Sequence, residues 1–207
     1  VGVMRSDDGG ATFARRDEGI VSLAGPEDEP FDGSCVHGLV ADPADPNRIW
    51  RQDHSGVYRT TDGGDSWQKI EQGLPGVFGF PIARDDASGA LFVVPLEADV
   101  NRLPVGGRFC AYRSTDDGDS WHVSGTGWSD GPVFTSVLRR AMCTDGAGGI
   151  YLGTAGGSIW ASRDAGENWL EVTARFPRIK TVTVLDSCCP RSGCRRCSIP
   201  PPRACDR

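Results

Sequence analysis

Short apolar runs separated by turn residues dominate the chain. Runs such as Leu91-Phe-Val-Val and Ile150-Tyr-Leu are rich in β-branched and aromatic residues, and Gly, Pro, Asp or Asn bounds them. This pattern is typical of strands, and no long stretch places apolar residues at helical spacing. The pattern therefore predicts an all-β chain of many short strands joined by turns.

One motif occurs four times along the chain. Each copy reads hydroxyl, any residue, Asp, any residue, Gly, any residue, small polar residue, aromatic, over residues 6–13, 60–67, 114–121 and 162–169. The motif aspartates are Asp8, Asp62, Asp116 and Asp164, so the periods are 54, 54 and 48 residues. A repeat that stays in step over most of the chain indicates a repeat architecture.

The spacing within the motif predicts a hairpin turn. The Asp carboxylate can accept hydrogen bonds from its own turn, and a Gly two residues later tolerates positive φ. The aromatic residue then begins the next strand as its first inward side chain. The four structural sets are Asp8, Gly10 and Phe13; Asp62, Gly64 and Trp67; Asp116, Gly118 and Trp121; and Asp164, Gly166 and Trp169. We expect them to stabilise hairpins on the face away from any ligand, and Asp116→Ala to cost about 1–3 kcal/mol.

Four strands accompany each period, which is the signature of a β-propeller blade. Whole blades are expected over about 35–71, 80–124 and 137–173, with partial strands in 1–17 and a lone first strand in 179–185. The prediction is an all-β propeller of four-stranded antiparallel blades, with about three to four blades present. Since propellers close with more blades and avoid open edges, we expect a fragment of a larger propeller. A small, nearly four-bladed ring is the alternative.

The motif resembles the Asp box of BNR-repeat propellers. Gly56-Val-Tyr-Arg-Thr-Thr-Asp-Gly-Gly-Asp-Ser-Trp, with Phe78-Gly-Phe-Pro-Ile-Ala downstream, is similar to bacterial sialidase-like and glycosyl-hydrolase-like BNR-repeat proteins. The wider group includes xyloglucanase-type, sortilin-type and photosystem II assembly-factor-like propellers. The resemblance covers residues 1 to about 185. It implies the fold far more specifically than the activity, because these families share the turn and not the reaction.

Composition and charge exclude some partners. The net charge of −6 and the sequence pI of about 5.1 argue against a nucleic acid bound through its phosphates. No apolar run approaches the roughly 18 residues of a membrane span. We therefore expect a carbohydrate or protein ligand, no nucleic acid, no membrane span and no cofactor. The oligomeric state stays open.

The last segment, 186–207, changes character and holds five of the eight cysteines. Cys194 and Cys197 have zinc-ligand spacing, but a second such pair is lacking, so no metal is expected and these two remain an alternative. A disulfide knot is another alternative, and a disordered or artefactual terminus is the preferred interpretation. The other three cysteines, 35, 110 and 143, lie in apolar strands and should be small buried residues. Their odd number argues against a secreted disulfide framework; the localisation stays unknown, with the cytoplasm slightly favoured.

Blade topology places the candidate chemistry on the face opposite the motif turns. That face should carry the loops between second and third strands and the connections between blades, where ligand sites form. The candidate catalytic residues are Asp53, Glu97, Asp99 and Asp130. The candidate ligand-binding residues are His54, Phe78, Arg102, Trp128, Arg139 and Arg140. One of the last two, which open a first strand, should face the central channel.

This collection of Arg, carboxylate and aromatic residues is what glycan binding uses. The prediction is a glycosyl-hydrolase-like propeller that binds a carbohydrate or hydrolyses it with paired carboxylates. A non-catalytic interaction or assembly scaffold is the alternative, so enzymatic activity is left open. True sialidase activity is not expected, because the blade core accounts for all three Tyr and the Phe/Tyr-Arg-Ile-Pro motif is absent.

Overall fold

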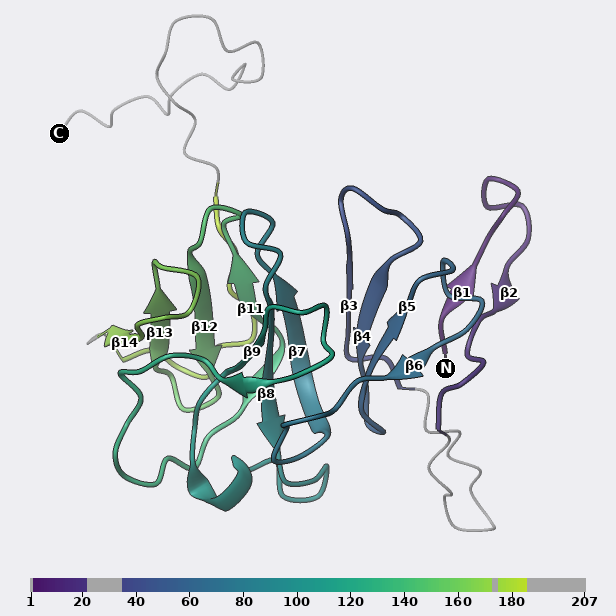
Figure 1. The fold of residues 1–207 in the computed structure, drawn as a ribbon. Helices are drawn as coiled ribbons and strands as arrows, with labels where there is room; N and C mark the ends of the chain where they lie inside the picture. Colours follow the sequence, from purple (N-terminus) through teal and green to yellow (C-terminus); the bar gives the residue numbers. More distant parts are fainter. Residues whose placement is uncertain (1, 22–34, 173–174, 186–207) are drawn as a thin grey trace, which may run out of the picture.

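The computed structural model describes residues 2–21, 35–172 and 175–185. Within them, three four-stranded antiparallel sheets and one two-stranded sheet follow one another along the chain (Figure 1). The two-stranded sheet pairs β1 (Met4–Arg5) with β2 (Ala14–Arg15). The strands are short, as the sequence predicts, and the fold is a β-propeller made of blades.

Each four-stranded sheet is one blade, with its strands hydrogen-bonded in chain order. The first blade comprises β3 (Gly38–Ala41), β4 (Ile49–Gln52), β5 (Val57–Thr60) and β6 (Gln68–Lys69). The second comprises β7 (Phe78–Arg84), β8 (Leu91–Leu96), β9 (Tyr112–Ser114) and β10 (His122–Val123), with the 3-10 turn η1 (Val105–Gly107) between β8 and β9. The third comprises β11 (Val137–Thr144), β12 (Ile150–Thr154), β13 (Ile159–Ser162) and β14 (Leu170–Val172).

The first strand of each blade is the innermost. β7 contacts both β3 and β11, so these three strands lie side by side although about 40 to 60 residues separate them in the sequence (Figure 1). Two large apolar clusters fill the spaces around them, one including Trp50, Val93 and Trp121 and the other including Phe92, Leu152 and Trp169. Burial of these side chains is the main stabilising contribution to the fold.

The segment 179–185, which we expect to be a lone strand, does not form a regular strand in the structure. Thr181 makes a single parallel bridge to Arg140, and the Val182 amide donates to the Arg140 carbonyl at 2.9 Å. This segment also lies against β12, because the Ile179 side chain packs over Gly153. The predictions for the tail, including Cys194 and Cys197, lie outside the described residues.

The three cysteines predicted to lie in the core differ in burial. Cys110 is buried, and burial raises the pKa of its thiol to about 11. Cys35 and Cys143 are half-buried. Cys35 precedes β3 instead of lying within it, because that strand begins only at Gly38. Cys110 likewise precedes β9, and Cys143 lies in β11 but is only half-buried, so the expectation of three buried strand cysteines is wrong in part for each.

The four motif segments form the tight turns that their spacing predicts. In the second copy the Asp62 carboxylate accepts hydrogen bonds from the Ser66 amide at 2.9 Å and the Ser66 hydroxyl at 2.6 Å. The Thr60 hydroxyl donates to the same carboxylate and accepts the Gly64 amide at 2.9 Å. The other three copies repeat these contacts. The motif carboxylates are thus occupied in holding their turns.

Each motif Trp also joins its blade to the blade before it. The amides of Trp67, Trp121 and Trp169 donate to the carbonyls of Glu18, Gln72 and Thr126, each at 2.8 Å. The indole N–H groups of the same residues donate to Arg16 O, Ile70 O and Ser124 Oγ. In each case the residue that accepts the Trp amide lies ten residues after the preceding motif Asp, and the residue that accepts the indole lies eight residues after it. The repeat pattern therefore sets the contact between blades.

The aromatic residue of the first motif copy departs from the expected inward position. Phe13 is 60% exposed, whereas Trp67, Trp121 and Trp169 are 5%, 1% and 3% exposed. Each Trp packs against the blade that precedes its own, and among the described residues no blade precedes the β1–β2 pair. The expectation that every motif aromatic is an inward side chain is therefore wrong for Phe13.

The motif glycine of the last copy does more than the predicted turn requires. Gly166 has the expected positive φ, 86°, and the Ser162 hydroxyl accepts its amide at 3.0 Å. It is also buried against the second blade: its carbonyl accepts the Ser124 hydroxyl at 2.9 Å, and a Cβ there would lie 2.7 Å from the Phe92 ring. Gly166 thus also forms part of the contact between blades, in addition to its predicted place in the turn.

Candidate functional site

Hydrogen bonds between loops identify the two faces of the blades. The Ala165 amide of a motif turn donates to Gly148, in the turn between β11 and β12, so these turns share one face. The Ala155 amide, after β12, donates to Ser136 in the connection between blades, so these segments share the opposite face. We call the second one the connector face. It is the face on which the sequence places the candidate chemistry.

A group of aromatic and cationic side chains lies where the three innermost strands meet this face. It comprises His37, His54, Phe78, Phe80, Arg102 and Arg139, and we call it the inner-strand cluster. β7 supplies the two Phe, the segment before β3 supplies His37, and β11 supplies Arg139. The cluster therefore draws on three blades that the sequence separates.

His37 is the buried centre of this cluster, with 5% of its surface exposed. Its amide donates to Gln52 O at 2.9 Å, and its Nδ1 lies 2.5 Å from Gly79 O. Its ring centroid is 4.5 Å from that of His54 and 4.8 Å from that of Phe80. Burial lowers the pKa of His37 to about 4, which keeps this imidazole neutral at neutral pH.

His54 stands on a turn that a buried carboxylate holds. Asp53 is fully buried, and its Oδ1 accepts the amides of Ser55 at 2.7 Å and Gly56 at 3.0 Å. Its Oδ2 lies 2.9 Å from the buried Arg51 guanidinium. Burial raises the pKa of Asp53 and lowers that of His54. Asp53 therefore positions His54 and does not itself reach a ligand, contrary to its place among the candidate acids.

Two guanidinium groups cover the cluster. The Cζ atoms of Arg102 and Arg139 lie 5.3 and 5.0 Å from the Phe80 ring centroid, within the range of cation–π contacts. Asp99 pairs with Arg102 at 2.7 Å, and both side chains are about half exposed. Arg139 thus lies over the Phe80 ring although it is exposed, and the expectation that it or Arg140 faces a central channel stays a prediction. Arg140 is exposed and its backbone bonds to the 181–182 segment.

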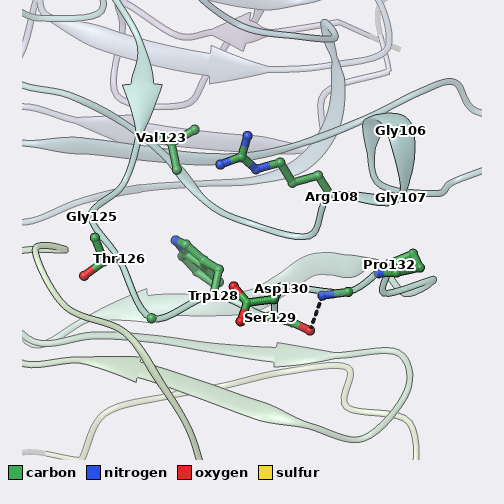
Figure 2. Close-up of a pocket in the computed structure, with 12 residues that line it drawn as sticks. Gly106, Gly107, Arg108, Val123, Gly125, Thr126, Trp128, Ser129, Asp130 and Pro132 are labelled. Carbon is green, nitrogen blue, oxygen red and sulfur yellow. Dashed lines mark hydrogen bonds between the residues drawn. The ribbon is translucent and has the colours of Figure 1, made fainter.

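A second concave surface lies farther out on the connector face. It is a groove of about 700 Å³ lined by residues 106–108, 123 and 125–132, and we call it the connector groove. Figure 2 shows Arg108 on one side of it and Trp128 with Asp130 on the other. Glycines make up five of the twelve lining residues, so backbone amides and carbonyls form much of its wall.

Trp128 is fixed rather than free to rotate. Its ring centroid lies 4.6 Å from that of Trp169 and 5.2 Å from that of Trp160, and its indole donates to Ser124 O at 2.8 Å. The core aromatics thus hold one side of the indole while another part lines the groove. A rigid aromatic wall with neighbouring polar groups is suited to binding a sugar ring.

The structure separates the candidate residues into groups. His54, Phe78, Arg102 and Arg139, with Asp99, belong to the inner-strand cluster or its edge, and Trp128 and Asp130 belong to the connector groove. Glu97 joins neither: its Oε1 accepts the Gly106 amide at 3.3 Å, and its Oε2 accepts from Asn101 at 3.4 Å. Sequence reasoning missed His37, Phe80 and Arg108. Packing of separate blades brings His37 and Phe80 to the named candidates, and Arg108 meets Trp128 and Asp130 only through the fold of the 106–132 segment.

Comparison with known proteins supports the fold. The chain aligns with an ancestral GH74 enzyme at a TM-score of 0.58 and 18% identity, covering 84% of this chain and 21% of that one. A GH74 xyloglucanase from Xanthomonas campestris aligns at a TM-score of 0.56 and 17% identity, and the alignment covers 84% of this chain and 27% of that one. YCF48 from Cyanidioschyzon merolae aligns more weakly, at a TM-score of 0.45 and 20% identity, and the alignment covers 66% of this chain and 36% of that one.

The chain thus spans about a fifth to a quarter of the length of the GH74 structures that it matches. No family model matches it, and a search of curated proteins likewise finds no match. Among the described residues, no helix is long and apolar enough to cross a membrane. At these identities the likeness establishes the fold alone: the chain consists of β-propeller blades.

Proposed function

We propose that the connector face binds a carbohydrate, with the sugar seated in the connector groove. The observation that carries this proposal is the combination of a fixed indole edge, the Arg108 guanidinium and the Asp130 carboxylate in one open groove of about 700 Å³. Apolar contact with the indole, together with hydrogen bonds that sugar hydroxyls accept from Arg and donate to a carboxylate or backbone carbonyl, is a usual means of sugar recognition.

Binding is favoured over hydrolysis at this groove. Glycoside hydrolysis uses two carboxyl groups about 5–10 Å apart across the scissile bond. Asp130 is the single acid among the twelve residues that line the groove. Of the other candidate acids, Asp53 is buried, while Glu97 and Asp99 are bonded within the 97–106 insertion. A sugar bound here would therefore lack a second acid.

Calorimetric titration of the protein with defined oligosaccharides tests the proposal. Xyloglucan oligosaccharides are a suitable first probe because one GH74 neighbour is a xyloglucanase, with acidic oligosaccharides as the second. Arg108→Ala and Asp130→Ala should each weaken binding about tenfold, since each removes a charge-assisted hydrogen bond. Arg163→Ala, on the motif face, is the matched control and should leave the affinity unchanged.

Two results would reject this assignment. The first is a lack of heat with every oligosaccharide tested while the protein remains folded. The second is an equal loss of affinity in Arg163→Ala. If the protein released reducing sugar and Asp130→Ala abolished that release, the groove would hydrolyse its ligand.

A protein-binding scaffold is the second candidate, and exposed apolar side chains favour it. Val77, Val100 and Phe134 lie in connector-face segments and are 38%, 90% and 69% exposed. Apolar side chains on one face can form the core of an interface with another protein. Val100→Ser and Phe134→Ser should abolish binding of a protein partner while leaving sugar titrations unchanged, which separates the two functions.

A further inference from the structure

Three metal-ligating side chains lie together at the edge of the inner-strand cluster. Cys35, His37 and His54 each offer one donor atom, and these atoms all lie within 4.8 Å of one another. Zn–N bonds of about 2.0–2.1 Å and Zn–S bonds of about 2.3 Å place tetrahedral ligand atoms about 3.3–3.8 Å apart. The cluster thus needs to contract by about 1 Å. Cys35 and His54, both half-buried, have room for that adjustment.

The buried His37 ring supplies an independent observation that points to a ligand. Its Nδ1 is bonded to the Gly79 carbonyl, which can only accept, so Nδ1 carries the proton and Nε2 keeps its lone pair. Nε2 is buried and has no hydrogen-bond partner among the described residues. Buried polar nitrogens are rarely left in this state. Metal-binding histidines commonly donate their other N–H to a carbonyl, as His37 does.

The local backbone holds two of the three ligands in place. His37 is tied to β4 by its amide bond to Gln52, and the Asp53 turn fixes His54 directly after the same strand. The two rings are thereby set edge to face with their centroids 4.5 Å apart. Such preorganisation reduces the conformational entropy lost when a ligand binds.

The surrounding charges suit a site that includes a thiolate. Arg139 Nη2 lies 3.9 Å from Cys35 Sγ, where it can donate a weak hydrogen bond to a metal-bound sulfur. Arg102 also lies over the neighbouring Phe80, and Asp99 pairs with Arg102 at 2.7 Å. A thiolate and a nearby carboxylate offset the two guanidinium groups around a divalent cation.

We propose that Cys35, His37 and His54 bind Zn²⁺ through one thiolate and two imidazoles, leaving a fourth position open. The Cys35 thiol gives its proton to solvent when sulfur binds. A donor set of two nitrogens and one sulfur selects a borderline metal such as zinc over Mg²⁺ or Ca²⁺, which prefer oxygen. The open position takes water or an anionic ligand, whose charge Arg102 and Arg139 would attract. This site goes beyond the proposed sugar binding and is separate from the connector groove.

The test uses the full chain with the five tail cysteines replaced by Ser, because they could bind metal themselves. Co²⁺ serves as the spectroscopic probe, and Zn²⁺ affinity is measured by chelator competition. We expect one equivalent of Co²⁺ to give tetrahedral d–d bands and a thiolate charge-transfer band. Cys35→Ser should remove the charge-transfer band. His54→Ala should weaken Zn²⁺ binding beyond the roughly 10–100-fold that outer-shell changes cost.

Cys143→Ser and His122→Ala are the matched controls, since each removes the same residue type elsewhere, and both should leave the spectrum and affinity unchanged. Circular dichroism of every variant separates loss of ligand from loss of fold. His54→Gln replaces Cys35→Ser if the latter does not fold. The proposal fails if the full chain without its tail cysteines binds no Co²⁺, or if the charge-transfer band persists in Cys35→Ser.

Discussion

In three of the four motif copies the hydroxyl is the buried group and the aspartate is at the surface. Thr60, Ser114 and Ser162 are 2%, 1% and 1% exposed, and each accepts the amide of the buried motif Gly. The Asp116 carboxylate is exposed, as is its hydrogen bond from the Ser120 amide. The hydroxyl therefore satisfies the buried amide of the turn, and Asp116 accepts from its exposed donors.

Ser114→Ala should consequently destabilise the protein more than Asp116→Ala. The first leaves the buried Gly118 amide without an acceptor, at a cost of about 1–3 kcal/mol, whereas water can replace the carboxylate for about 1 kcal/mol. Urea unfolding of both variants measures the order. Ser120→Ala, which removes an exposed hydroxyl of the same turn, should cost least. The reverse order would mean that the carboxylate is the main support of the turn.

Ala165 occupies a backbone conformation that glycine adopts more easily. Its φ of 54° matches the positive φ of Gly9 and Gly63 at the same motif position. Ala165→Gly should therefore raise stability slightly, by up to about 1 kcal/mol, because relief of strain exceeds the added flexibility of the unfolded chain. Thermal unfolding provides the measurement. A lower melting temperature would show that Ala165 is unstrained.

At the scale of elements, a glycine after the fourth strand lets neighbouring blades approach closely. Gly19, Gly73 and Gly127 have φ of 85°, 93° and 96°, and a Cβ on each would lie 1.9–2.2 Å from the carbonyl oxygen of the next motif Trp. They stand eleven residues after the first three motif Asp residues, a regularity that the sequence contains but that sequence reasoning did not use.

Gly73→Ala should destabilise the protein by at least about 2 kcal/mol, because the new Cβ meets backbone that cannot move aside. Gly10→Ala is a close control. Its φ is 94°, nearly that of Gly73, but a Cβ there meets nothing within 4 Å. The difference between the two variants in denaturant unfolding isolates the clash. Equal losses would show that backbone strain alone accounts for the effect.

At the scale of the whole molecule, the motif aspartates couple stability to pH. Hydrogen bonds from the last polar residue of each turn lower their pKa, to about 2 for Asp116 and Asp164, from an ordinary 3.8. Asp8 and Asp62 are lowered for the same reason. Because the folded state favours the ionised form, this stability is present above the ordinary pKa and is lost as pH falls toward 2.

The melting temperature should therefore begin to fall below about pH 6.5, because the unfolded chain protonates His37 more readily than the folded protein does. The motif aspartates should add a second fall between about pH 4 and pH 2. The double variant Asp116→Asn, Asp164→Asn should show a shallower fall across that window. Differential scanning calorimetry over pH measures both curves. An unchanged slope in the double variant would mean that other carboxylates govern acid unfolding.

The fold is readable from the sequence because local signals repeat. Each period carries its own turn chemistry, strand pattern and motif aromatic, so every copy supports the same interpretation. The exposure of Phe13 shows the limit of that reasoning, because the burial of a motif aromatic depends on a neighbouring blade and not on its own turn.

The candidate site is harder to predict from the sequence. His54, Phe78 and Arg139 follow from their places in loops and strand ends, but His37 does not, because its burial depends on β3 packing beside β7. Long-range packing of this kind leaves no periodic trace.

The hydrogen bonds of the motif Trp residues run in one direction along the chain. Each motif Trp donates to the blade before it at a fixed offset, so the Trp of one blade and its acceptors on the preceding blade form a pair that repeats. Such an interface is heterologous and repeats without change. A duplicated 54-residue period would bring a matching donor set and acceptor set with it. The architecture can therefore lengthen by gene duplication one blade at a time, with no new interface to evolve.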